Sequence, residues 1–181
     1  MAVESQIALF RREFASLRRF AERALAQVSD DDFFVVLGPS DNSLAVMVKH
    51  LAGNLRSRWR AFLTTDGEKP DRDRDGEFEV TEGEARAALM EAWEEGWGHL
   101  AAALDPLTDE DLVRSVTIRG EAFTVLQAIQ RQISHYAFHV GQIVFLAKHL
   151  AGTNWKSLTI PKGASKSFNA APQSYLEPET S

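Results

Sequence analysis

Two histidines four residues apart, His135 and His139, are the residues of this chain whose types and spacing point most directly to chemistry. An α-helix has about 3.6 residues per turn, so positions i and i+4 lie on one face, about one turn apart. Two imidazoles placed in this way can bind one metal ion. A His-x-x-x-His pair also arises by chance, so the hypothesis needs a third ligand from another helix. His50 is the candidate.

Composition limits what else could hold a metal. The chain has no cysteine, which excludes disulfides, a cysteine nucleophile and thiolate ligands. Any metal must therefore be held by histidine, carboxylate, amide or water, and any thiol must come from a substrate or cofactor. Three histidines suit zinc, nickel, copper and iron, of which we favour zinc or nickel.

The charge balance and the distribution of apolar residues narrow the class of partner. The chain has 20 Lys plus Arg against 26 Asp plus Glu, a net charge of −6. A broad basic surface for nucleic acid is therefore not expected. The first residues lack the pattern of a signal peptide, and no apolar run approaches the roughly 20 residues of a membrane span. We expect a cytoplasmic protein that acts on a small molecule, without nucleic acid or membrane partners.

The elements that must position these histidines follow from hydrophobic periodicity. Apolar residues recur with helical spacing in four segments, which we predict as helices over about 4–27, 43–64, 81–104 and 124–150. Capping boxes at Thr81–Glu84 and Thr124–Gln127 mark the starts of the third and fourth helices. A short hairpin or irregular connector turning at Gly120 should join these two. The prediction is an all-α four-helix bundle over residues 1–152, with an irregular tail over 153–181 that packs partly on the bundle.

The segment 65–80 breaks the helical pattern. It contains Gly67, Pro70 and Gly76 together with the alternating charges of residues 71–75. We predict a loop whose charges form a solvated salt-bridge surface, with its arginines pairing with carboxylates of the same run.

The predicted helical faces place the three histidines at the edge of the core. His135 and His139 lie about 100° from the centre of the apolar stripe of their helix, and His50 lies about 120° from that of its own. The face around His50 carries small and polar residues, which let another helix or a ligand come close. Such strips suit a shallow metal cleft, but they also suit an ordinary exposed face. His99 and His149 fit a helix boundary and a cation near a helix C-terminus.

Several stretches in combination resemble a known family. They are the segment from Lys49 to Trp59, the segment from Leu63 to Phe78, the run from His135 to Ile143, and the run from Ser157 to Gly163. Over about residues 5–170 the chain resembles the DinB-like superfamily of four-helix bundles, in particular a bacterial branch without a settled activity. The resemblance implies an up-up-down-down bundle, frequent homodimers, and a divalent metal held by His50, His135 and His139.

The same resemblance suggests what the metal would do. Some characterised relatives transfer low-molecular-weight thiols such as bacillithiol or mycothiol to electrophiles, and others are described as metal-dependent hydrolases. Our first hypothesis is a metal-dependent transferase of a small thiol, in which Gln142 and Asn54 orient ligands or substrate and Arg131 meets an anionic group. The alternatives are a hydrolase and a non-catalytic, metal-stabilised dimeric scaffold or binding protein. We see no Asp or Glu beside either histidine motif to serve as a general base, which disfavours hydrolysis.

Overall fold

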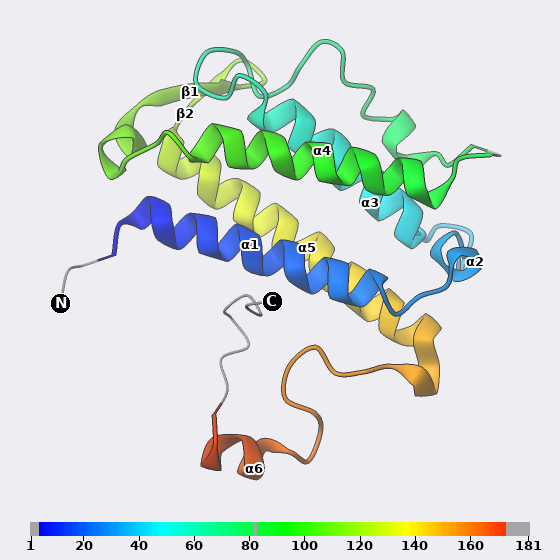
Figure 1. The fold of residues 1–181 in the computed structure, drawn as a ribbon. Coiled ribbons are helices and arrows are strands. Elements are labelled where there is room, and N and C mark those ends of the chain that lie inside the picture. Colours follow the sequence, from blue (N-terminus) through cyan, green and yellow to red (C-terminus); the bar gives the residue numbers. More distant parts are fainter. Residues whose placement is uncertain (1–3, 82, 173–181) are drawn as a thin grey trace.

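Four long helices dominate the computed structural model, which describes residues 4–81 and 83–172. They lie side by side around a shared apolar core (Figure 1) and comprise α1 (Gln6–Leu25), α3 (Leu44–Trp59), α4 (Arg86–Leu104) and α5 (Val125–Ala151). The protein is thus mostly helical. The short elements are α2 (Asp30–Phe33), η1 (Gly76–Phe78), η2 (Asp109–Val113), β1 (Ser115–Ile118), β2 (Glu121–Thr124), η3 (Gly152–Asn154) and α6 (Ser165–Ala170).

Hydroxyl side chains start several of these helices. The Oγ of Ser43 accepts a hydrogen bond from the backbone N–H of Val46 at the start of α3. Thr124 and Gln127 form the predicted capping box at the start of α5. Each such cap satisfies a backbone N–H that has no partner within its helix, and so fixes the residue at which the helix begins.

Three predicted helix boundaries are displaced in the structure, by two residues at the end of the first helix and by more in the other two cases. The first helix stops at Leu25, and Ser29 then caps the separate helix α2. The second stops at Trp59 rather than near residue 64, because Arg60 is extended and the φ angle of Ala61 is 50°. A residue in that left-handed region cannot continue a helix.

The start of the third helix is also displaced. It begins at Arg86 and not after Thr81, and residue 82 of the predicted capping box lies outside the described residues. One carboxylate oxygen of Glu84 does accept from the Thr81 N–H at 2.8 Å. The other forms an ion pair with Lys49 of α3, so Glu84 serves the packing of this loop rather than a helix start.

A two-stranded antiparallel hairpin joins α4 to α5 and turns at Arg119 and Gly120, as the sequence predicts for this connection. Both turn residues have positive φ angles of 56° and 77°, as in a two-residue type I′ turn. The carboxylate of Asp66 accepts from the backbone N–H groups of both turn residues at 2.8 Å. The hairpin is therefore fastened to the loop that follows α3.

The long helices pack as two pairs, α3 with α4 and α1 with α5. Buried aromatic residues fill the space between the pairs. The indole N–H of Trp59 donates to the hydroxyl of Tyr136 at 3.0 Å, and that hydroxyl donates to Asn54 at 3.1 Å. This short chain of hydrogen bonds links α3 to α5 within the core.

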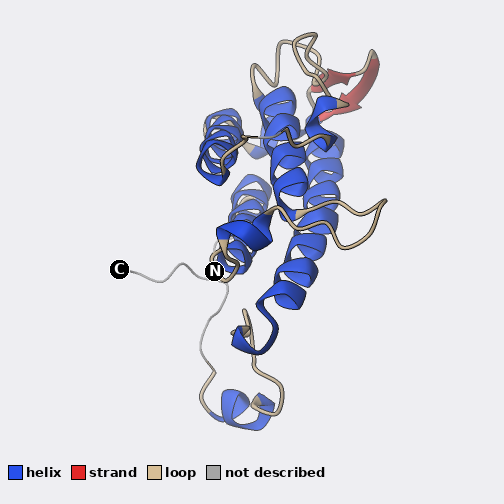
Figure 2. Ribbon diagram, turned by 90° about the vertical axis from the view of Figure 1, so that its right-hand side faces the viewer, coloured by secondary structure: helices blue, strands red, loops and turns tan. Residues whose placement is uncertain are grey.

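Residues 153–172 follow the end of α5, and residues 173–181 of the predicted tail lie outside the described part. Leu158 is buried, and its carbonyl accepts from Arg23 of α1. Gln27 bonds both the N–H and the carbonyl of Lys156. Figure 2 shows the hairpin at one end of the long helices and α6 at the other. Among the described residues, none of the helices has the length and apolar character needed to cross a bilayer.

Candidate metal centre

The structure brings His50 of α3 together with His135 and His139 of α5. Their ring centres are 4.7 to 5.4 Å apart, and one nitrogen of each ring lies within 4.8 Å of the others. The Nε2 atoms of His50 and His135 are only 3.3 Å apart. The group joins the two helix pairs, because α3 belongs to one and α5 to the other.

Glu77 sets the orientation of His50. Its Oε2 lies 2.9 Å from Nδ1 of His50, and both side chains are about 6% exposed. A carboxylate accepts hydrogen bonds, so Nδ1 carries the proton and Nε2 presents its lone pair to the other histidines. A carboxylate behind a histidine is a recurrent support of metal-binding imidazoles. Sequence reasoning did not find Glu77; the one available signal was the aromatic Phe78 beside it in an otherwise charged loop.

Arg72 in turn holds Glu77. Its guanidinium donates to both carboxylate oxygens at 2.7 and 2.8 Å, and its side chain is 4% exposed. Burial alone would raise the pKa of Glu77, but the hydrogen bonds from Arg72 and His50 outweigh it and hold that pKa below its ordinary value. Glu77 is therefore a carboxylate whose two oxygens are already engaged.

The buried ion pair of Arg72 with Glu77 corrects the prediction of a solvated charge surface at residues 71–75. Arg72 is buried and pairs with Glu68 and Glu77, both outside the run, while Asp71 pairs with Arg56 and Arg60. Among the described ion pairs, only Arg74 with Asp75 lies within the run. Alternation of charge in a sequence does not reveal that one member folds inward.

The two histidines of α5 are kept neutral. Burial, together with the neighbouring His139 and His50, lowers the pKa of His135 to about 3. Burial also lowers the pKa of His139, against the raising effect of its hydrogen bond with Gln142. Oε1 of Gln142 lies 2.8 Å from Nδ1 of His139, so this nitrogen donates and Nε2 is left with its lone pair. Metal ligation requires neutral imidazole.

The geometry fits a metal ion. Two imidazole nitrogens on one tetrahedral zinc ion, each at about 2.0–2.1 Å, lie about 3.3–3.4 Å apart. The observed separation between His50 and His135 is 3.3 Å. The Nδ1 of His135 is buried and has no hydrogen-bond partner within the described part of the chain. The contact of this ring with another side chain of the centre is therefore made by Nε2, which faces Nε2 of His50 where an ion would lie. The three histidines could hold a divalent ion.

A cavity of about 310 Å³ adjoins the three histidines. Its other lining residues are predominantly basic or amide-bearing: Asn54, Arg58, Arg72, Arg74, Phe78, Arg119, Arg131 and Gln132. The ring of Phe78 lies 4.8 Å from that of His50 and supplies an apolar wall. The centre thus opens onto a cavity whose lining is rich in cationic donors.

Comparison with known proteins places the chain in a family. The family model described as "Protein of unknown function (DUF1572)" matches residues 3–164, a span that contains all three histidines and Glu77. The chain belongs to this family. No curated protein and no solved structure matches it.

The other residues that the sequence predicts for the site differ in whether they contact a histidine, line the cavity or stand apart from both. Arg131 lines the cavity from the exposed side of α5, 6.0 Å from the centre of the Phe123 ring. Asn54 also lines it, but its Oδ1 accepts from Tyr136 rather than from a histidine. Gln142 contacts His139 directly. His99 and His149 stand apart from the group; the first lies 3.3 Å from Glu95, and the second is exposed in the last turn of α5.

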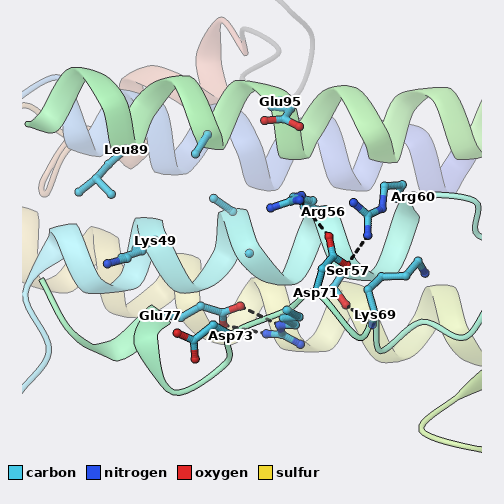
Figure 3. Close-up of a pocket in the computed structure, with 14 residues that line it drawn as sticks. Lys49, Arg56, Ser57, Arg60, Lys69, Asp71, Asp73, Glu77, Leu89 and Glu95 are labelled. Atoms are coloured by element: carbon cyan, nitrogen blue, oxygen red, sulfur yellow. Dashed lines mark hydrogen bonds and ion pairs between the residues drawn. The ribbon is translucent and has the colours of Figure 1, made fainter. Parts of the chain in front are cut away.

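A second cavity of the DUF1572 chain, of about 300 Å³, lies between α3, α4 and the loop over residues 69–77. Figure 3 shows Arg56 and Arg60 each joined to Asp71. Arg72 lines both cavities. The Arg72–Glu77 pair therefore supports the histidine centre from a segment that is itself partly open on its other face.

Proposed function

We propose that this protein is a divalent-metal-dependent transferase that joins a small thiol to an electrophilic small molecule. The observation that carries the proposal is the convergence of three imidazoles, of which His50 and His139 each have Nδ1 engaged by a partner, beside a cation-lined cavity. Three protein ligands leave a coordination position open, as in catalytic zinc sites. When bound, a divalent ion would supply a lowered pKa for a thiol or water beside it.

The surrounding residues favour thiol transfer over hydrolysis. A hydrolase needs a carboxylate or similar base free to take a proton from water. Glu77 is the carboxylate nearest to His50, but Arg72 and His50 occupy both of its oxygens. Within the described residues, the lining of the histidine cavity includes no Asp or Glu. A thiol needs no such base once its pKa is lowered, and the absence of cysteine means that the thiol is external.

We further propose that the fold is a DinB-like four-helix bundle. The arrangement of ligands supports this relation: one histidine on the second long helix and an i, i+4 pair on the fourth. The two helix pairs and their shared core are also what such a bundle requires.

Elemental analysis of the untagged protein tests the ligand set. We expect about one zinc or nickel ion per chain in the wild type, and loss of that ion in both His50→Ala and His135→Ala. His149→Ala is the matched control, because His149 is an exposed histidine of α5 outside the group. An absence of metal after reloading with zinc and nickel, or full retention in both variants, would refute the site.

A conjugation assay then tests the reaction. Glutathione and 1-chloro-2,4-dinitrobenzene serve as probes; a sulfur–carbon bond forms, the carbon–chlorine bond breaks, and chloride and a proton are released. We expect turnover above the uncatalysed rate that is lost in His135→Ala and restored to the metal-stripped wild type by zinc or nickel. Metal binding without metal-dependent turnover across a panel of small thiols would contradict the transferase and leave the ion as a structural link between α3 and α5.

A further inference from the structure

Several residues that line the histidine cavity carry buried polar atoms without hydrogen-bond partners. Five such side-chain atoms occur among the described residues, and three belong to residues that line this cavity: Nε of Arg58, Oε1 of Gln132 and Nδ1 of His135. Arg58 and Gln132 are 5% and 3% exposed. Buried polar groups in folded proteins are nearly always hydrogen-bonded, so a cluster of exceptions calls for an explanation. A bound molecule that supplies an acceptor to Arg58 and a donor to Gln132 provides one.

The charges around the cavity specify the sign of that molecule. Five arginines line it, and the carboxylates that pair with them most closely are Glu68 and Glu77. Arg131 forms no ion pair with any described residue, and Arg74 has only the fully exposed Asp75 at 3.8 Å. This positive surplus occurs in a chain of net charge −6. It therefore marks a local site for an anion.

The hairpin between α4 and α5 contributes one of the five arginines, Arg119, to the cavity. Asp66 holds the backbone of Arg119 and Gly120, so the turn carries the Arg119 side chain to the cavity. Glu68 accepts from Arg58 and from Arg119 at 3.1 Å each, and thus keeps two guanidinium groups close together. Guanidinium groups bind carboxylates through paired hydrogen bonds, and neighbouring ones suit a ligand with more than one carboxylate.

We propose that the cavity binds a small molecule with at least two carboxylates and an amide N–H, the carboxylates meeting Arg58, Arg119 and Arg131 and the N–H donating to Oε1 of Gln132. The inference rests on the proposed function, in which this molecule is the thiol-bearing substrate. It assigns the hairpin and Gln132 to substrate recognition rather than to the metal.

Calorimetric titration with two matched probes tests the assignment. N-acetyl-L-aspartate has two carboxylates and an amide N–H, and O-acetyl-L-malate differs in having an ester oxygen in place of the N–H. With the zinc-loaded full-length protein we expect saturable binding of both, with N-acetyl-L-aspartate bound several-fold more tightly. Arg131→Gln and Arg119→Gln, both at exposed positions, should weaken both probes about tenfold or more. Gln132→Met should abolish the preference for the amide.

Arg12→Gln is the control, because Arg12 lies on α1 outside the cavity, is exposed, and pairs with Glu4. It should bind both probes as the wild type does. An absence of saturable binding, or equal binding by wild type, Arg119→Gln and Arg131→Gln, would overturn the subsite. Zinc content is measured on every sample, so a failure of the metal-dependent function can be distinguished from a failure of the proposed carboxylate-binding cavity. Probe binding by a protein that takes up no metal would refute the proposed function alone, and zinc uptake without probe binding would refute the subsite alone.

Discussion

At the scale of single residues, the histidine centre depends on contacts that restrict each ring. Glu77 fixes the proton of His50 and Gln142 that of His139, whereas the buried Nδ1 of His135 has no partner among the described residues and its Nε2 faces His50. Gly53 makes the first of these contacts possible, because a Cβ at that position would overlap the carboxylate of Glu77. The strip of small residues beside His50 thus admits a carboxylate from the following loop.

Replacing Glu77 by glutamine tests this support. We expect Glu77→Gln to weaken zinc binding about 10–100-fold, because the neutral amide holds the His50 ring less firmly and leaves Arg72 without its buried counter-charge. Competition with a chromophoric chelator measures the affinity. Glu79→Gln is the matched control, since Glu79 is exposed and only its backbone carbonyl bonds to Lys49. Equal affinities for Glu77→Gln and the wild type would show that Glu77 does not support the ligand.

The sequence predicts the residues on helices better than those in loops. Helical period relates the position of a residue to the direction of its side chain, so His135, His139 and His50 could be proposed as one group. Glu77 lies 27 residues after His50 in an irregular segment. No period operates there, and the inward turn of Arg72 and Glu77 depends on contacts with α3 that only the folded chain reveals.

At the scale of elements, the contact of α3 with α4 depends on one glycine. A Cβ on Gly96 would lie 2.9 Å from Cβ of Leu55 and 3.3 Å from the carbonyl oxygen of Ala52, both on α3. The two helices therefore approach each other too closely for any side chain at this position. Gly98 lies one half-turn further along α4, is exposed, and faces open space.

These two glycines form a matched pair for a stability measurement. Gly96→Ala should lower the free energy of unfolding by about 1–3 kcal/mol, because the added methyl group forces α3 and α4 apart. Gly98→Ala should raise it by about 0.5–1 kcal/mol, because alanine loses less backbone entropy in a helix. Urea unfolding followed by circular dichroism measures both values. A shift in the same direction for both variants would contradict the close packing at Gly96.

The attachment of the hairpin should depend on pH through Asp66. Burial tends to raise the pKa of Asp66, but hydrogen bonds from three backbone N–H groups hold it below its ordinary value. A carboxyl group with a depressed folded-state pKa stabilises the fold above its unfolded pKa, and this contribution is lost as pH falls through the folded one. We expect the amide proton shifts of Arg119 and Gly120 to titrate together with a midpoint below about 3.9. Asp66→Asn should show no such step, and a midpoint above 4 in the wild type would exclude the contact.

The sequence predicts the boundary of an element where a characteristic residue type makes the cap or the turn. It does not predict the boundary where the helix ends because of a backbone angle that the residue type does not reveal. The capping box at Thr124 and the turn at Gly120 are visible in the residue types, and both are present. The end of α3 depends on a positive φ angle at Ala61, a residue type that otherwise favours helix. Glu84 fits a capping pattern, but an ion pair with Lys49 of another element takes one of its oxygens.

At the scale of the whole molecule, the centre lies where the two helix pairs meet. Packing is extensive within α3–α4 and within α1–α5, and the pairs are joined by the aromatic core, the Trp59–Tyr136–Asn54 hydrogen bonds and the three histidines. A metal ion on His50, His135 and His139 would tie α3 to α5 and thereby one pair to the other. Because the ligands come from both pairs, the site exists only when the pairs are docked.

Metal should therefore stabilise the whole fold. An ion that binds only the folded chain adds about 2.7 kcal/mol when its free concentration is a hundred times its Kd. For a chain of this size that corresponds to a rise in Tm of about 5–10 °C. We expect zinc to raise the Tm of the wild type and of His149→Ala by this amount, and to slow amide exchange along α3 and α5. His135→Ala should melt at one temperature with or without zinc. A Tm that zinc leaves unchanged in the wild type, or raises equally in His135→Ala, would show that the ion does not join the two helix pairs.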